Sequence, residues 1–283
     1  MVFFQFFLKV LFVIHGIGAA SGLVVDQNYI YAVSDDNASL FIYNTKKHKV
    51  ETVDLNPEVK QQKGNKKDKP DFETITRYKN QLFIAGSGSK ENRFDLISYD
   101  LKTKQVHHSN YNDLFDDFLK ISKLSQHDFN IEGMIATDHA TYFFNRGNGP
   151  AKMNGIFKVN GAINDLKNQA ISFHPIQLPE LNGELTTFSD AILVNDKVLF
   201  TATVESKSST QYNGEVKGSI IGELDLQSNQ VVKWKKISDH QKIEGLALLK
   251  ETRKHYSLYL CEDNDDDSKQ ASIYQFKLAK TFE

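Results

Sequence analysis

The chain has 283 residues, a formal net charge of −2 and one cysteine. The balanced charge argues against a general attraction to nucleic acid or to anionic membranes, and a lone cysteine rules out an internal disulfide and is typical of a reducing compartment. The length allows one large repetitive unit or about two ordinary domains, and no break between two domains occurs in the sequence. The 20 Phe and 11 Tyr residues favour β-sheet packing.

The N-terminal segment, residues 1–20, is strongly apolar and ends in small residues. One interpretation is a secretory signal peptide with Lys9 as its positive charge. The other is a strand at residues 7–15 that belongs to the folded domain. Lys9 interrupts the apolar run, which weakens a signal core, and the segment is too short for a transmembrane helix. The sequence therefore predicts no integral membrane segment.

The first repeat shows the plan of the others. Turn residues separate four predicted strands, at 22–26, 29–34, 40–44 and 49–55. Four short strands in a row are typical of one blade of a β-propeller. The segment that follows, residues 58–70, holds five lysines and no aromatic side chain, so it predicts a solvated connection and no nucleic-acid site.

Three further repeats follow this plan, and a fifth is incomplete. Their predicted strands are 73–78, 81–85, 96–100 and 105–109; 132–137, 140–145, 155–159 and 171–178; 190–194, 198–204, 219–226 and 231–238; and 244–249, 257–261 and 272–278. Apolar residues at a helical spacing predict a short outer helix at 112–124, with Asn112 and Asp113 as candidate caps. The fifth repeat lacks a fourth strand, so we expect residues 7–15 to supply it and to remove an open sheet edge.

The expected fold is all-β, a single β-propeller over residues 1–283. Similar short segments open the five repeats and recur about every 50–60 residues, a spacing typical of propellers and solenoids. Five four-stranded blades closed by the N-terminal strand account for this spacing, and six blades are the alternative. The expected blades are 21–57, 71–110, 130–178, 188–238, and 242–280 together with 7–15.

The candidate chemistry lies at the start of the first strand of each repeat. These strands line the central channel of a propeller. The side chains at one phase of each strand, that is, on one of its two faces, therefore converge on the axis. That phase carries Ser21, Glu73, Glu132, Asp190 and Glu244. Four carboxylates aimed at one channel cannot all stay ionised and unpaired, since repulsion and desolvation both favour the protonated form.

Two interpretations of these carboxylates stay open. In the first, Glu73, Glu132, Asp190 and Glu244 ligate one divalent cation, and the all-oxygen ligand set with Asn130 close by favours calcium. In the second, the carboxylates accept hydrogen bonds from backbone N–H groups of the adjacent blade and hold the ring together without metal.

A second set of polar residues follows the second strand of each repeat. These turns leave corresponding strands and should gather at one face of the disc, where ligands commonly bind. The two arginines are candidate anion binders, because guanidinium groups pair with carboxylate or phosphate; a salt bridge at the surface or between blades is the alternative. The predicted ligand-binding set is Arg93, Arg146, Asp36, Glu205 and Asp263.

Two other features predict no site. Asp263, Asp265 and Asp267 begin like an EF-hand loop, but the twelfth position is Tyr274 in place of the required Glu. Cys261 lies in a predicted strand, so we expect a buried core residue rather than a nucleophile.

The motifs at the inner strands resemble those of known propellers. Asp71-Phe72-Glu73, Asn130-Ile131-Glu132-Gly133 and Lys242-Ile243-Glu244-Gly245-Leu246 look like motifs of bacterial phytase-like and esterase-like propellers. Over essentially the whole chain, the order of its Ser-Gly-Leu, Asp-Asp, Gly-Ser-Gly-Ser, Asn-Arg-Gly-Asn and Asp-Asn-Asp motifs is similar to an uncharacterised bacterial domain family of about this length. The resemblance implies calcium binding or hydrolysis among related propellers, and no established activity for the uncharacterised family.

Two functions are compatible with the sequence. The one we favour is a non-catalytic module that binds a small molecule or a protein partner and has an acidic central channel. The other is a divalent-metal-dependent hydrolase of esters, phosphoesters or lactones, with Glu132, Glu244 and Arg146 as catalytic candidates. We expect one divalent cation or no cofactor, a monomer, and a cytoplasmic location, with export as the alternative if residues 1–20 are cleaved.

Overall fold

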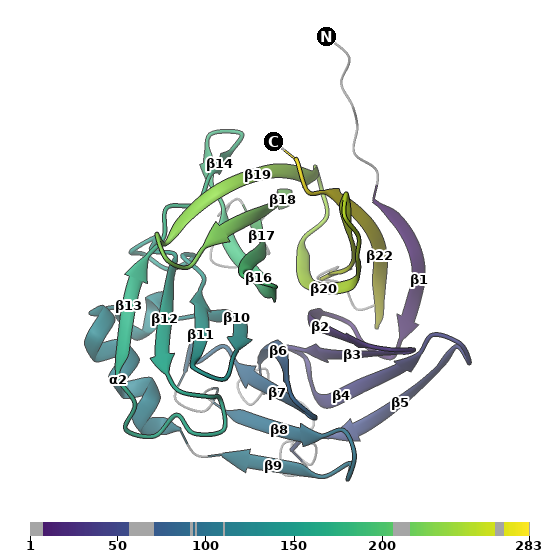
Figure 1. The fold of residues 1–283 in the computed structure, drawn as a ribbon, viewed down its shortest axis with the longest axis horizontal. Coiled ribbons are helices and arrows are strands. Elements are labelled where there is room, and N and C mark those ends of the chain that lie inside the picture. Colours follow the sequence, from purple (N-terminus) through teal and green to yellow (C-terminus); the bar gives the residue numbers. More distant parts are fainter. Residues whose placement is uncertain are drawn as a thin grey trace.

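The structure is a computed structural model that describes residues 8–56, 71–90, 93, 95–109, 111–205, 216–263 and 269–282. Five antiparallel sheets of four strands surround a common axis, as Figure 1 shows. The predicted all-β propeller is therefore confirmed, and of the two blade numbers considered, five is correct. The lysine-rich segment at 58–70 lies outside the described residues.

Each blade runs from an inner strand beside the axis to an outer strand at the rim (Figure 1). From inner to outer, the blades are β2 (Ala20–Asp26), β3 (Tyr29–Ser34), β4 (Asn37–Asn44) and β5 (Lys49–Asp54); β6 (Phe72–Tyr78), β7 (Gln81–Gly86), β8 (Leu96–Asp100) and β9 (Val106–Ser109); β10 (Ile131–Ala136), β11 (Ala140–Asn145), β12 (Gly155–Asn160) and β13 (Ile171–Pro175); β16 (Thr187–Val194), β17 (Lys197–Glu205), β18 (Val216–Asp225) and β19 (Gln230–Ser238); and β20 (Ile243–Glu251), β21 (His255–Glu262), β22 (Gln270–Ala279) and β1 (Lys9–His15). A small hairpin of β14 (Glu180–Leu181) and β15 (Glu184–Leu185) connects the third and fourth blades.

Burial explains the sequence of each kind of strand. The second strand of a blade is covered on both faces by the neighbouring blades, so its sequence is a nearly continuous apolar run, as in β7 and β21. An outer strand such as β19 faces solvent on one side, and its exposed and half-buried residues alternate.

Among the described residues, the hydrophobic core consists of five clusters, one at each junction between neighbouring blades. The first and second blades, for example, share Leu40, Phe72 and Ile84. The fifth and first blades share Leu23 and Cys261 in the same way. Each blade is therefore stabilised mainly by burying both of its faces against its neighbours, because apolar burial is the dominant favourable contribution to folding.

The strand β1 closes the ring as predicted. It pairs antiparallel with β22, from Lys9 opposite Gln275 to His15 opposite Gln270, and so completes the fifth blade. Ile14 is buried in the junction with the first blade. Because the ring is closed, each described blade has a neighbour on both of its faces. Strands from the two ends of the chain meet within the sheet of the fifth blade.

The predicted outer helix is α2 (Asn112–Ser122), followed by the 3-10 turn η3 (Gln126–Asp128). Its buried face packs against the second and third blades, and the rings of Phe118 and Phe157 stack with centroids 4.3 Å apart. The helix is capped at Tyr111 without a side-chain hydrogen bond, so the prediction of Asn112 or Asp113 as the cap is wrong. No helix of the described residues is long and apolar enough to cross a membrane.

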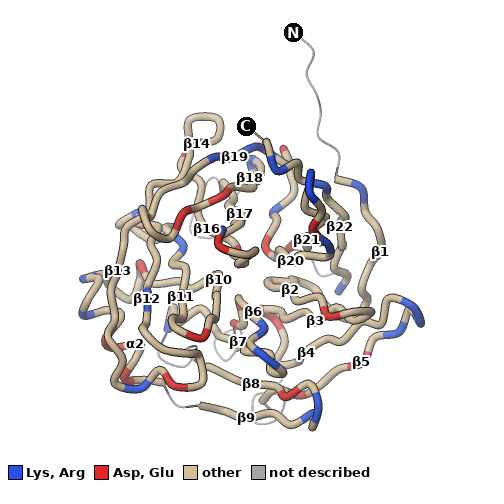
Figure 2. The backbone as a smooth tube through the Cα atoms, viewed as in Figure 1, with Lys and Arg blue, Asp and Glu red and all other residues tan. Residues whose placement is uncertain are grey.

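Charged residues are distributed unevenly between rim and axis. Figure 2 shows lysines and arginines mostly on the outer strands and turns, with acidic residues also present on the inner strands around the axis. The starts of the inner strands pair with the ends of the second strands, as Ile131 does with Asn145. The two polar sets that the sequence analysis identified therefore lie at the same face of the disc.

Candidate functional site

Every inner strand carries a β-bulge at the same place. In all five blades the pairing with the second strand shifts by one residue near the start of the inner strand. A bulge leaves one extra residue outside the ladder and re-aims its side chain. The five extra residues are Ser21, Glu73, Glu132, Ser189 and Glu244.

Three of the five bulge residues are glutamates, and they lie close together. Glu73, Glu132 and Glu244, which we call the glutamate cluster, each have a carboxylate oxygen within 4.8 Å of the other two. Glu132 and Glu244 are buried and Glu73 is half-buried. Desolvation raises the pKa of all three carboxyl groups, that of Glu132 to about 8.

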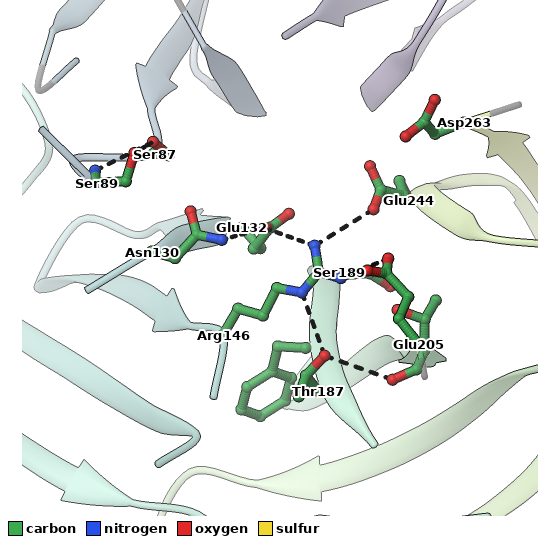
Figure 3. Close-up of polar contacts among 12 residues, drawn as sticks. Ser87, Ser89, Asn130, Glu132, Arg146, Thr187, Ser189, Glu205, Glu244 and Asp263 are labelled. Carbon is green, nitrogen blue, oxygen red and sulfur yellow. Dashed lines mark hydrogen bonds and ion pairs between the residues drawn. The ribbon is translucent and has the colours of Figure 1, made fainter. Parts of the chain in front are cut away.

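The positive charge of Arg146 compensates the negative charge on one side of the glutamate cluster. It follows β11, and Figure 3 shows its guanidinium between carboxylates of the third, fourth and fifth blades. Its Nη1 lies 3.0 Å from Glu132 Oε1 and 3.5 Å from Glu244 Oε1, and its Nη2 lies 2.7 Å from Glu205 Oε1. Burial alone would lower the pKa of Arg146, but the three carboxylates raise it well above its ordinary value, so the guanidinium remains charged.

The positive charge of Lys242 compensates the negative charge on the side of the cluster where Glu244 lies. Its Nζ lies 3.0 Å from Glu244 Oε1, 2.8 Å from Asp263 Oδ2 and 3.4 Å from Glu205 Oε1. Burial would raise the pKa of Glu205, but Arg146 and Lys242 together outweigh it and lower this pKa to about 2. Glu205 is therefore ionised at every pH at which the protein would be studied.

Glu73 has a different environment. Desolvation raises the pKa of this carboxyl group well above its ordinary range, and so do the charged groups around it. The charged neighbours with the largest effect on it are all carboxylates, those of Glu132, Asp71, Glu244 and Asp35. Arg93 pairs with Asp71 at 2.9 Å, and Asp71 also accepts a hydrogen bond from Ser87. Glu73 thus lies at the side of the cluster where negative charge is least compensated.

Two buried oxygens of the cluster, Glu132 Oε2 and Glu244 Oε1, have no hydrogen-bond partner among the described residues, and Glu244 Oε1 is held instead by its ion pairs with Lys242 and Arg146. Glu132 Oε1 accepts hydrogen bonds from the Asn130 amide at 2.7 Å and from Arg146 at 3.0 Å (Figure 3). Glu132 Oε2 is buried and has no hydrogen-bond partner among the described residues. Leaving a buried polar atom unsatisfied costs about 1–3 kcal/mol, so this oxygen, in a carboxyl group within 4.8 Å of those of Glu73 and Glu244, marks a position for a further group.

Asp190 lies one residue beyond the bulge position that the sequence analysis gave it. The extra residue of β16 is Ser189, whose hydroxyl donates to the Ile243 carbonyl at 2.7 Å. The Asp190 carboxylate accepts from the backbone N–H groups of Ala191 and Leu246, each at 2.7 Å. Asp190 therefore does what the second interpretation of the carboxylates expected, because it joins the fourth blade to the fifth.

The remaining predicted ligand residues divide into two groups. Glu205 and Asp263 join the ion-pair network of Arg146 and Lys242. Asp36 lies in the turn after β3, with its carboxylate close to the backbone of Gly18. The residues Asp265 and Asp267 lie outside the described residues.

Sequence reasoning missed Lys242 and Asp71 as parts of the site. The available signal was their equal spacing, since each precedes a bulge glutamate by two residues, in Asp71-Phe72-Glu73 and Lys242-Ile243-Glu244. Their ion-pair partners, Asp263 and Arg93, are 21 and 22 residues away in the chain, so no local pattern identifies the pairs.

The arrangement is suited to a cation. The guanidinium groups of Arg93 and Arg146 are both engaged by carboxylates, and the described carboxylates of the site outnumber its cationic side chains. These carboxylates are Asp35, Asp71, Glu73, Glu132, Glu205, Glu244 and Asp263, and the cations are Arg93, Arg146 and Lys242. A hard cation with oxygen ligands would balance the excess at the glutamate cluster.

The fold and the bulge carboxylates define a five-bladed propeller with an acidic cluster at the start of its inner strands. The sequence profile of the family of unknown function DUF6929 matches residues 16–278, and the chain belongs to this family. The expected membership of an uncharacterised propeller family is thereby confirmed. A search of curated proteins found no match.

Several solved structures share the fold. The allergen Mala s 1 of Malassezia sympodialis has a TM-score of 0.55 at 12% identity, covering 96% of this chain and 98% of that chain. Glutaminyl cyclase of Myxococcus xanthus has a TM-score of 0.53 at 10% identity, covering 96% of each. A point mutant of an α-L-arabinanase of Cellvibrio cellulosa has a TM-score of 0.51 at 12% identity, covering 94% of this chain and 96% of that chain. These likenesses concern the fold alone.

Proposed function

We propose that the protein is a non-catalytic binding propeller in which the glutamate cluster holds one divalent cation, calcium preferred, as part of its ligand site. The observation that carries this proposal is the buried, unpartnered Oε2 of Glu132 beside Glu73 and Glu244. A cation at this position would satisfy that oxygen and would also neutralise Glu73, whose strongest charged neighbours are carboxylates.

The spacing of the carboxylates supports calcium. Calcium binds oxygen ligands at about 2.3–2.6 Å, so two oxygens on opposite sides of one ion are about 5 Å apart. The three carboxylate oxygens of the glutamate cluster lie within 4.8 Å of one another, which one such ion spans without movement of the backbone. Magnesium demands shorter distances and retains water, so we expect it to bind more weakly.

The network of Arg146 and Lys242 supports binding rather than hydrolysis of an anionic substrate. Arg146 is buried and Lys242 is half-buried, and both are occupied by Glu132, Glu205, Glu244 or Asp263. Recruiting Arg146 to a phosphoester would leave Glu132 without its cationic partner and would leave Glu205 and Glu244 to Lys242 alone, which is costly in a desolvated place.

One observation favours the second candidate, a metal-dependent hydrolase of esters or lactones. The pKa of Glu132, about 8, lies near neutral pH, where a carboxyl group exchanges a proton most usefully as a general acid or base. In that case Glu132 would transfer the proton, and Glu73 and Glu244 would hold a cation that would supply Lewis-acid chemistry. A screen of uncharged esters and lactones, with Glu132→Gln as the inactive reference, tests this candidate separately from cation binding.

The first experiment is titration of calcium into chelated protein, followed by thermal melts. We expect one calcium per chain and a melting temperature that rises with calcium, since a ligand at 100 times its Kd stabilises by about 2.7 kcal/mol. Glu73→Gln should lose at least tenfold in affinity, because the cation loses one anionic ligand. Its metal-free melt should equal or exceed that of the wild type, because the change removes repulsion.

The control is Glu180→Gln, which alters an exposed glutamate of β14 and should bind calcium like the wild type. A Glu73→Gln variant that lowers the metal-free melt while calcium has no effect on either protein would contradict the proposal. That result would mean that the glutamates are structural hydrogen-bond acceptors.

A further inference from the structure

The opposite end of the inner strands lines a cavity of about 310 Å³ that is open to solvent. Two or three consecutive residues from each of the five inner strands line it, and they follow the bulges by two to four positions. Val24, Ile135, Leu193 and Leu248 are typical of this lining. The cavity is therefore separate from the glutamate cluster, which lies where the same strands begin.

The side chains of the lining are mostly aliphatic, polar groups supply about half of the surface left accessible, and the lining is incompletely covered. Val24, Ile192, Leu193 and Leu248 are half-buried although they belong to strands at the centre of the molecule. Apolar surface left accessible in a concave place loses the stabilisation that burial provides, and such surface is characteristic of a ligand site. A ligand with an apolar body would recover this stabilisation.

The charge of the lining selects the class of ligand. Arg77 is the one charged side chain among the described residues that line the cavity. Its Nη1 lies 2.6 Å from Asp26 Oδ1, and its Nε donates to the Lys79 carbonyl at 3.0 Å. Because this pair is neutral as a whole, it offers no net charge to a ligand, and Thr76 adds only a hydroxyl group to the lining.

The volume limits the size of the ligand. An apolar cavity of about 150 Å³ holds one benzene molecule, and this cavity is roughly twice as large. Ligand pockets for small molecules begin at about 300 Å³. A short alkyl chain or a two-ring aromatic group matches these limits.

We propose that this cavity binds a small uncharged molecule with an aliphatic or aromatic body and a single hydrogen-bonding group, such as a medium-chain alcohol. The lining from all five blades makes the site a property of the closed ring. It does not depend on a cation at the glutamate cluster.

The test is a calorimetric titration with octan-1-ol, with octanoate and octylammonium as charged analogues of the same chain length. We expect saturable binding of octan-1-ol to the wild type, at least tenfold tighter than either charged analogue. Ala136→Phe, which fills the cavity, should weaken octan-1-ol binding at least tenfold. Leu193→Asp, which places a charge in the lining, should do the same without adding volume.

The matched control is Ala170→Phe, because Ala170 is exposed and lies outside the cavity. This variant should bind octan-1-ol like the wild type. Equal affinity of folded Ala136→Phe and wild type, no saturable binding to folded wild type, or equally tight binding of a charged analogue would each overturn the proposal. Binding of octan-1-ol should persist in Glu73→Gln, so failure of the cation site leaves this test intact.

Discussion

Arg146 is the residue on which the site depends electrostatically. Its side chain is 7% exposed and contacts carboxylates on three blades. Removing one partner of a buried ion pair leaves an uncompensated charge, which costs about 3–5 kcal/mol. The same guanidinium keeps Glu132 from being fully neutral, because it opposes the rise in the pKa that burial causes.

We expect Arg146→Met to destabilise the protein by about 3–5 kcal/mol, measured by urea unfolding at neutral pH. The exposed Arg253 provides the matched control, and Arg253→Met should stay within about 0.5 kcal/mol of the wild type. Adding Glu132→Gln to Arg146→Met should recover part of the loss, because the charge left unpaired is then removed. A double variant as unstable as the sum of the two single variants would argue against this pairing.

The pH dependence of stability follows from Glu132. Its pKa is raised from 4.5 to about 8, so between these values the folded protein holds a proton that the unfolded chain has released. Stability of the metal-free protein should therefore fall as the pH rises from about 5 to about 8. Glu205, whose pKa is lowered to about 2, contributes stability that is lost only below this window.

We expect the melting temperature of chelated protein to be higher at pH 6 than at pH 8, and calcium to reduce the difference. Calcium replaces the proton at the cluster, so its affinity should increase over the same range. Thermal melts at both pH values, with chelator and with calcium, measure both effects. A chelated protein that becomes more stable towards pH 8 would show that the cluster is ionised without a cation.

At the scale of the element, the repeated bulge decides which residues share the axis. The bulge adds one residue to the inner strand. The alternation of side chains between the two faces of the strand therefore shifts by one residue across the bulge. In the fourth blade this places Ser189 at the equivalent of Glu73, and it turns Asp190 towards the backbone of β20. A glycine occupies the position of Asp190 in three other blades, as Gly133 does close to the Ala191 backbone.

Asp190→Ala should destabilise the protein by about 1–3 kcal/mol, because the Leu246 N–H loses its buried acceptor. Calcium affinity should be unchanged, since Asp190 is not one of the clustered carboxylates. The control is Asp196→Ala, in the exposed turn after the same strand. Loss of calcium binding in a stable Asp190→Ala protein would return Asp190 to the metal site.

At the scale of the whole molecule, closure of the ring depends on one strand from the other end of the chain. Without β1, the strand β22 would present an open edge with unpaired backbone groups, which favours association with other chains. The contact of Phe12 with Tyr43, with ring centroids 4.7 Å apart, would also be lost between the fifth and first blades.

Removal of residues 1–15 should therefore lower the melting temperature and produce aggregates in size-exclusion chromatography. A peptide of residues 8–17 added in excess should restore part of the stability, because it can pair with β22. Full-length Lys9→Ala, altered at an exposed position, serves as the control and should remain unaggregated. A truncated protein with the melt and elution of the full chain would contradict a closing role for β1.

The sequence by itself predicted the strand plan, and it favoured five blades over six and a closing strand at residues 7–15 over a cleaved signal peptide. Strand and turn residues recur at a regular spacing, and a fifth repeat with three strands leaves one place for a fourth strand, which the apolar residues 7–15 can fill. It also identified Glu73, Glu132 and Glu244, because a repeated strand start must converge on the axis.

Only the tertiary structure decided that Ser189, and not Asp190, occupies the bulge of the fourth blade. It also decided the partners of Arg146 and Lys242. A single extra residue in a strand changes which side chain faces the axis, and nothing in the local sequence around Ser189 marks where the bulge falls. Arg146 meets Glu205, 59 residues away, and Lys242 meets Asp263, 21 residues away, because neighbouring strands and blades bring them together. Long-range pairing and burial set these charges, and neither is encoded in the spacing of residues along the chain.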